Sequence, residues 1–160
     1  MKKPLIATAL LSPLFLAATH ISAVAATDTI PFSGTVDPVC TILVDSPGTI
    51  APNTDHTALS SQEAGGSPGV ATIQTSNANF SVSTTAPTVF TSAPTGGDTD
   101  VTFATFYSAS GATTLDNIAG SSASVLDQGT TTLSVDLTAT KASGTFPDGN
   151  YAADVVVTCE

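Results

Sequence analysis

Few side chains in this sequence are of the kinds that catalyse reactions. His56 is the only histidine after residue 26, and it lies among Asn, Asp and Thr residues that are typical of an exposed loop. No Ser–His–Asp arrangement and no motif of paired catalytic carboxylates accompanies it. We therefore expect no enzymatic activity and no cofactor.

The strongest oxygen-ligand pattern is Asp98 and Asp100, which follow Gly96 and Gly97. Calcium prefers hard oxygen ligands of this kind, but two carboxylates do not complete a calcium site. Asp beside Gly is also ordinary turn chemistry. We expect a turn here, with weak calcium binding as the alternative, and no metal site elsewhere.

The two cysteines, Cys40 and Cys159, are the remaining reactive pair. In an oxidising compartment an even number of cysteines favours a disulfide over free thiols. A bond that closes so long a loop contributes roughly 4–5 kcal/mol in the chain-entropy model. The sequence therefore predicts a disulfide between the start and the end of the domain, with two free thiols as the alternative.

Residues 1–26 have the pattern of a secretory signal peptide. Lys2 and Lys3 precede a short apolar run over 5–18, and small residues over 23–26 offer a cleavage site. The run is shorter than the roughly 20 residues of a membrane span, so a retained anchor is the weaker interpretation. We expect export through the periplasm to the cell surface or beyond.

The chain is acidic, with a formal net charge of −10. Once Lys2 and Lys3 are removed with the signal peptide, Lys141 is the only basic side chain apart from His56. Nucleic acids and anionic membranes are recognised through basic patches, so neither is expected as a partner.

The elements that must position these residues are strands. After the Pro-Asp-Gly turn at 147–149, an apolar row alternates with a mixed row, the period of a strand that covers a core. The apolar row is Tyr151, Ala153, Val155, Val157 and Cys159. A second alternating row opens the mature chain and comprises Ile30, Phe32, Gly34 and Val36.

Further alternating stretches predict strands over 40–44, 70–75, 80–83, 101–107 and 133–139, with a short one at 88–91. Residues 52–69 have the composition of an exposed loop, and residues 112–130 are polar and irregular. About seven short strands around one core indicate an all-β domain, a single β-sandwich over residues 27–160.

Two motifs resemble the ends of subunits from chaperone–usher pili and of the related spore-coat-U-like secreted proteins. They are Phe32-x-Gly34-x-Val36 followed by Cys40, and Gly149-x-Tyr151 opening the terminal strand. The resemblance implies an immunoglobulin-like β-sandwich that lacks its last strand. It also implies that a periplasmic chaperone, and then an N-terminal strand of the next subunit, fills the vacancy.

On this resemblance, the terminal row from Tyr151 to Val157 lines an acceptor groove. The row from Ile30 to Val36 is either the domain's own first strand, which we favour because its removal would expose an edge, or the donor strand. The expected function is a structural or adhesive surface protein, a pilus subunit whose partners are like subunits and a chaperone. The alternative is a self-contained secreted sandwich that binds a glycan or surface ligand through its loops.

Overall fold

The computed structural model describes residues 24–160, so nearly all of the predicted signal peptide, 1–26, lies outside the described residues. The chain divides between Thr35 and Val36, and residues 36–160 form the folded unit. This unit begins later than the predicted domain start at residue 27. Residues 24–39 contain no strand.

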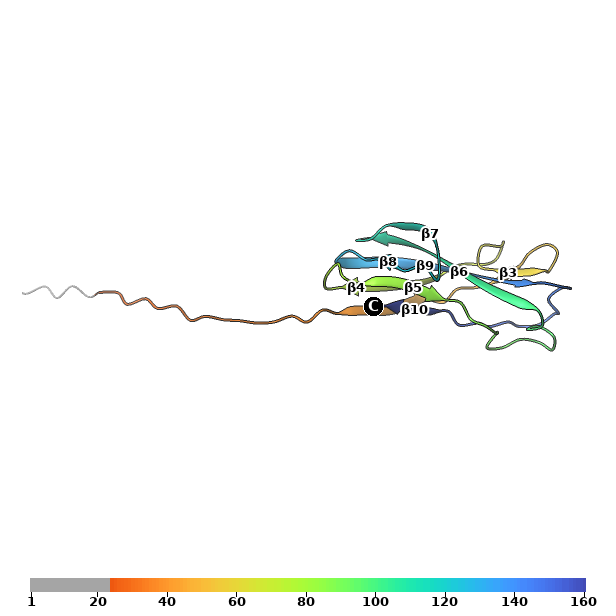
Figure 1. The fold of residues 1–160 in the computed structure, drawn as a ribbon, viewed down its shortest axis with the longest axis horizontal. Helices are drawn as coiled ribbons and strands as arrows, with labels where there is room; N and C mark the ends of the chain where they lie inside the picture. Colours follow the sequence, from red (N-terminus) through yellow and green to blue (C-terminus); the bar gives the residue numbers. More distant parts are fainter. Residues whose placement is uncertain (1–23) are drawn as a thin grey trace, which may run out of the picture. The chain divides into compact units, whose positions relative to one another are not determined.

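The folded unit is built from ten β-strands arranged in two antiparallel sheets, and residues 24–160 contain no helix (Figure 1). The larger sheet comprises β1 (Cys40–Ser46), β2 (Ala51–Pro52), β3 (Ala58–Ser60), β4 (Gly69–Thr75), β6 (Val101–Gly111), β7 (Leu115–Ala119) and β9 (Gly129–Lys141). The smaller sheet comprises β5 (Ser81–Thr85), β8 (Ser124–Val125) and β10 (Val156–Cys159). The predicted all-β class is confirmed, and the two sheets are consistent with a β-sandwich.

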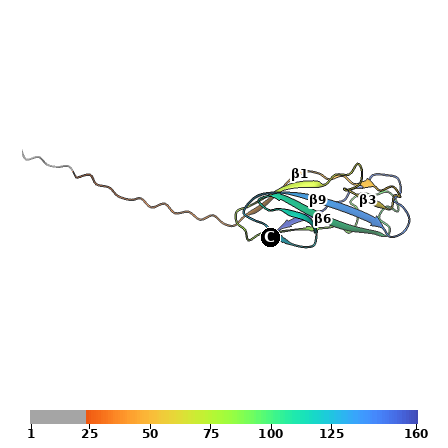
Figure 2. The same cartoon turned by 90° about the horizontal axis from the view of Figure 1, so that it is seen from above.

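The long strand β9 is the centre of the larger sheet. One edge of β9 pairs with β6 from Thr131 to Lys141 (Figure 2). The other edge pairs first with β4 and then with β3. Beyond β4 lies β1, which has no second partner in its sheet, and β10 has only β5 as a neighbour in the smaller sheet. Both β1 and β10 are therefore edge strands.

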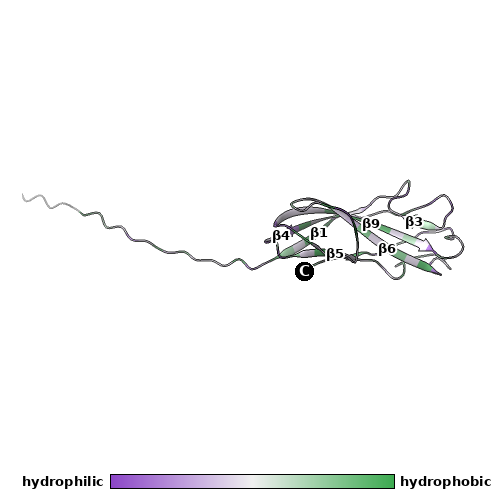
Figure 3. Cartoon of the chain, turned by 45° about the horizontal axis from the view of Figure 1, so that its top comes forward, coloured by the Kyte–Doolittle hydropathy of each residue, from purple (hydrophilic) through white to green (hydrophobic). Residues whose placement is uncertain are grey.

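One core cluster lies where the two sheets meet. It contains the fully buried side chains of Ile73, Val82, Tyr107, Leu126 and Leu133. Apolar residues gather on the strands and alternate there with polar ones, as β6 and β9 show in Figure 3. This alternation places one row of each strand in the core and the other in solvent.

A second, aromatic cluster lies towards the other end of β9. The Phe90 ring packs edge-on against Phe103 at 4.8 Å and against Tyr151 at 5.0 Å between centroids. Phe146 completes the cluster, with its ring 5.5 Å from that of Tyr151. Edge-to-face contacts of this kind are favourable beyond the area that they bury.

Lys141 is buried beside this aromatic cluster. Its Nζ donates to the carbonyl oxygens of Gly96 at 3.0 Å and Thr99 at 2.7 Å, and lies 5.5 Å from the centre of the Phe146 ring. The ammonium group thereby holds the 94–100 loop in place. It is not available on the surface as a positive charge.

The structure extends the predicted strands in the middle of the chain. Residues 52–69, expected to be a loop, contain β3, whose Leu59 and Ser60 are buried. Residues 112–130, expected to be irregular, contain β7 and β8. Residues 88–91 form no strand, although Phe90 is buried. The count is thus ten strands where about seven were expected.

The expectation that residues 30–36 form the domain's first strand is not met. Ile30, Phe32 and Val36 are 77%, 94% and 87% exposed, and the segment belongs to neither sheet. The first strand starts only at Cys40, where pairing with β4 begins. The proline at position 38 lacks an amide hydrogen, which weakens any continuous ladder from the segment into β1.

Candidate functional site

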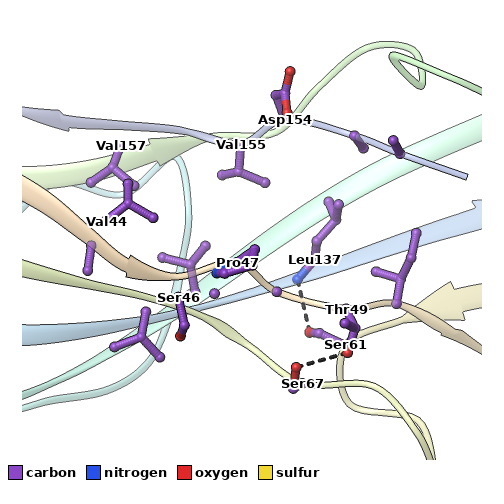
Figure 4. Close-up of a pocket in the computed structure, with 18 of the residues that line it drawn as sticks. Val44, Ser46, Pro47, Thr49, Ser61, Ser67, Leu137, Asp154, Val155 and Val157 are labelled. Carbon is purple, nitrogen blue, oxygen red and sulfur yellow. Dashed lines mark hydrogen bonds between the residues drawn. The ribbon is translucent and has the colours of Figure 1, made fainter.

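An open groove of about 520 Å³ lies beside β10 (Figure 4). One wall is formed by the end of β1 and the residues after it, including Val44, Ser46 and Pro47. The opposite wall is the stretch 151–157, and Val135 and Leu137 of β9 lie between the two walls. Figure 4 shows Val44, Val155, Val157 and Leu137 around the same space.

All four residues predicted to line an acceptor groove are found at this groove. Tyr151, Ala153, Val155 and Val157 are half-buried, whereas Ala152, Asp154 and Val156 between them are exposed. Ala152 and Asp154 also border the groove. The predicted alternation is therefore present. The inward row is only half covered because it faces the groove.

The opposite wall, β1, shows the same lack of cover. Ile42 is paired with Ile73 and Val44 with Ala71, and both partners are buried. Directly paired residues point to the same face of a sheet, so Ile42 and Val44 also point towards the core side. Yet they are 37% and 71% exposed. Two apolar rows thus face a space that the folded unit, residues 36–160, leaves unfilled.

The predicted disulfide is confirmed, and it joins the two walls. Cys40 opens β1 and Cys159 closes β10, with their Cα atoms 6.4 Å apart. Neither cysteine lines the groove. Its lining starts at Val44, which follows Cys40 on β1, and at Val157, which precedes Cys159 on β10. The disulfide therefore fixes the closed end of the groove.

The groove separates the two core clusters. Val135 and Val157 lie at the margin of the first cluster, whereas Ile50, Tyr151 and Ala153 lie at the margin of the second. An apolar segment placed in the groove would join both clusters into one continuous core. The burial of apolar surface would drive that process, at about 25 cal/mol per Å².

Three polar side chains that line the groove, those of Thr49, Ser61 and Ser67, are already paired. The Ser61 hydroxyl accepts from the Leu137 amide at 3.1 Å and donates to Asp136 at 2.6 Å, and the hydroxyls of Thr49 and Ser67 lie 2.9 Å apart. Across the described residues, no buried side-chain polar atom lacks a partner. The unmet requirements of the groove are apolar cover and backbone pairing along its strand edges.

Tyr151 stands at the aromatic end of the groove. Its hydroxyl donates to the carbonyl oxygen of Pro147 at 2.7 Å. Burial raises the pKa of this phenol, and the nearby carboxylates of Asp148 and Asp98 raise it further. The side chain is therefore a neutral hydrogen-bond donor at physiological pH.

The predicted calcium candidates are not brought together as ligands. Asp98 accepts a hydrogen bond from the Phe90 amide at 2.8 Å, and Asp100 accepts one from the Ser143 hydroxyl at 3.0 Å. Asp100 also has a positive φ of 56°, as residues in turns do. The part of the chain that the structure describes contains no group of three or more metal-ligating side chains.

His56 lies in the exposed loop that was expected for it. It has a positive φ of 55°, and its amide donates to the Asn53 carbonyl oxygen at 3.1 Å. Its own carbonyl oxygen accepts from the Phe146 amide at 2.8 Å. The residue serves a backbone turn and lies outside the groove.

Sequence reasoning missed the contribution of β1 to the site. Alternation over 40–44 predicted the strand, but not that its inner side chains Ile42 and Val44 would be uncovered. Leu137 lies within the predicted strand 133–139 and is both buried and a groove residue. The missing information was the order of strands in the sheet, which places β1 at an edge.

Neither a protein-family model nor a curated protein sequence matches this chain. Among residues 24–160, no helix has the length and apolar character needed to cross a membrane.

Proposed function

We propose that this chain is a structural or adhesive cell-surface protein, a pilus subunit that assembles by β-strand complementation. The groove receives residues 30–36 of a second copy as an added strand. The observation that carries the proposal is the pair of uncovered apolar rows, on β1 and on 151–157, between two edge strands. An added strand meets both needs of such a site, main-chain pairing and apolar side chains at alternate positions.

The proposed donor has the matching pattern. Ile30, Phe32, Gly34 and Val36 alternate along the chain as do Tyr151, Ala153, Val155 and Val157. The large donor side chains are exposed, and residues 30–36 belong to neither sheet. No strand pairing must therefore be broken before the donor binds. Large exposed apolar side chains at this spacing are typical of an interaction segment.

The edge strands also support the finer fold assignment, an immunoglobulin-like sandwich without its last strand. An exposed apolar edge is an aggregation hazard, which natural proteins cover. A periplasmic chaperone would provide that cover before assembly. The disulfide between Cys40 and Cys159 is in keeping with export to an oxidising compartment.

The direct test uses a chain lacking residues 27–36 and a synthetic peptide of residues 28–37. The peptide is expected to bind the truncated chain and raise its thermal unfolding temperature, since ligand bound to the folded state stabilises it. The full-length chain is expected to form oligomers that resist detergent, and the truncated chain is expected to remain monomeric.

Two matched peptides make the test specific. F32D places a charge in the apolar row, whereas S33D places the same charge in the opposite row. We expect F32D to abolish binding and S33D to retain it. If neither the unaltered peptide nor the full-length chain associates with this domain, the proposal is wrong and a self-contained sandwich is the better description.

A further inference from the structure

We infer that the Cys40–Cys159 disulfide is an end stop of the groove, the point beyond which a donor strand cannot reach. The bond thereby sets the depth and register of the donor, with its N-terminal end towards the disulfide. This inference rests on the proposed function. It gives the disulfide a role in assembly, besides the stability that it gives the folded unit.

The space between the two walls is too narrow for a third strand at the disulfide. Paired strands lie about 4.8 Å apart, so two walls with a strand between them must be about 9.6 Å apart. The Cα atoms of Cys40 and Cys159 are 6.4 Å apart, and a disulfide holds such atoms within about 7 Å of each other. A donor strand therefore has room only from Val44 and Val157 onward, where the lining of the groove starts.

The wall at 151–157 offers a regular backbone edge to such a strand. Ser81 and Glu160 exchange both backbone hydrogen bonds, at 2.7 Å and 3.0 Å, so the backbone groups of Glu160 face β5. Because these groups alternate between the two sides of a strand, those of Val157 and Val155 face the groove. Their side chains line it as well. By the same alternation, all four half-buried positions of this wall suit pairing with the inward residues of an antiparallel strand.

The wall at β1 offers a shorter edge. The Val39 carbonyl oxygen accepts from the Ser76 amide at 3.0 Å, so the backbone groups of Val39 face β4. By alternation, those of Ile42 and Val44 face the groove. The register of β1 then shifts between Val44 and Ser46. Past the disulfide, β1 thus has two positions for regular pairing with inward donor residues.

The lengths of these two edges favour one direction of the donor. The walls run in opposite directions, since β1 begins and β10 ends at the disulfide. Residues directly opposite each other in an antiparallel pair share a face and exchange both hydrogen bonds or none. The inward donor row therefore bonds to 151–157 if the donor is antiparallel to β10, and to β1 if it runs the other way. The first direction uses the longer edge.

The donor sequence suits the same direction. Pro31, which has no amide hydrogen, belongs to the outward row and then faces the shorter edge, on β1. After cleavage at the predicted site, only residues 27–29 precede Ile30. By contrast, a whole folded unit follows Val36 after the two residues Asp37 and Pro38. The short free end is the one that fits against the closed end of the groove.

The disulfide then fixes the register. With all four inward positions used, Ile30 lies opposite Val157 and Val36 lies opposite Tyr151. A strand two residues deeper would place Ile30 opposite Cys159, where the walls leave no room. A slip of one residue would turn the polar row inward. The deepest register that keeps the apolar row in the groove is therefore the one that stops at the bond.

The test is cross-linking between a full-length donor chain with T35C and an acceptor chain that lacks residues 27–36 and has A152C or D154C. In the inferred register Thr35 lies opposite Ala152, and Asp154 lies opposite Ser33. Residues two positions out of register are about 7–8 Å apart, beyond the usual reach of a disulfide. We expect T35C to link to A152C and not to D154C on non-reducing gels. A P31C donor, which would lie opposite Ala152 in the reverse direction, should not link to A152C.

Two further combinations control this test. S33C and D154C are opposite each other in either direction, so their link reports that the groove is occupied. Acceptors that also have C40S/C159S lack the stop. We expect T35C to link to D154C in these acceptors as well, because the donor can then slide two residues deeper.

The outcomes separate this inference from the proposed function. A T35C link to D154C in the oxidised acceptor, a P31C link to A152C, or a pattern that C40S/C159S leaves unchanged would each refute the end stop while strand complementation stands. The same holds if the 28–37 peptide binds but none of the cysteine pairs links. If neither the peptide nor the full-length chain binds the truncated chain, the proposed function falls, and this inference falls with it.

Discussion

At the residue scale, the hydroxyl of Tyr107 joins three segments inside the first core cluster. It lies 3.1 Å from the Val82 carbonyl oxygen, 2.6 Å from that of Ser122 and 2.7 Å from the Ser124 hydroxyl. The side chain is fully buried. A single phenol thus ties β6 to β5, to the loop before β8 and to β8 itself.

We predict that Y107F destabilises the folded unit by about 1–3 kcal/mol, because a buried acceptor loses its donor. Urea unfolding followed by circular dichroism measures the change. The exposed hydroxyl variant S110A on the same strand is the control, and it should unfold within about 0.5 kcal/mol of wild type. Equal destabilisation by both variants would show that the Tyr107 network contributes nothing specific.

Much of the residue pattern could be predicted from the sequence. The alternate burial of Leu133, Leu137 and Ala139, and the inward row from Tyr151 to Val157, follow from period-two patterning alone. The burial of Leu59 did not follow, because its neighbours Asn53 and Gly65 have turn-forming character and only pairing with β9 makes the segment a strand. Local composition cannot reveal a partner about 80 residues away.

At the element scale, β1 and β10 belong to different sheets, and the disulfide links them. Cys40 and Cys159 lie 119 residues apart, so this bond closes nearly the whole folded unit into one loop. Cross-linking so long a loop restricts the unfolded chain strongly. The same bond keeps the two walls of the groove together at one end.

We predict that the double variant C40S/C159S loses about 4–5 kcal/mol of stability relative to the oxidised protein. Urea unfolding of the variant and of the dithiothreitol-reduced wild type should agree, which controls for the serine side chains. An oxidised protein no more stable than its reduced form would contradict this account. The peptide of residues 28–37 should also bind the variant more weakly, because the walls are free to separate.

The alternating pattern in the sequence overestimated the length of the terminal strand. The alternation spans 151–159, but ladder pairing covers only Val156–Cys159, because residues 151–155 lie beside the groove with a single bridge from Ala152 to Ser92. Period-two patterning reports which side chains face inward and not whether a neighbouring strand is present. The same limitation applies to residues 30–36, which have the pattern of a strand without belonging to a sheet.

At the scale of the whole molecule, charge opposes the proposed assembly. Thirteen acidic side chains face only three lysines in the full sequence, and the one lysine within residues 24–160 is the buried Lys141. Copies of such a chain repel one another in solution. Apolar burial and main-chain pairing must therefore provide the whole driving force for association.

We predict that assembly of the full-length chain accelerates as salt rises from about 0.01 M to about 0.1 M, which shortens the screening length from about 30 Å to about 10 Å. Light scattering against time measures the rate. Binding of the short 28–37 peptide, which has only Asp28 and Asp37 as charged side chains, is the control and should respond less. Slower assembly at higher salt would instead indicate charge attraction between copies.

The buried position of Lys141 has a further consequence for digestion. Trypsin cuts after lysine or arginine, and within residues 24–160 Lys141 is its only target, held at the end of β9 by carbonyl oxygens of the 94–100 loop. Cleavage should require local opening and be slow in the native state. Because the Cys40–Cys159 bond spans the cut, the two fragments would stay linked and separate only on a reducing gel. The same architecture would let the proposed surface fibre persist where trypsin-like proteases are abundant.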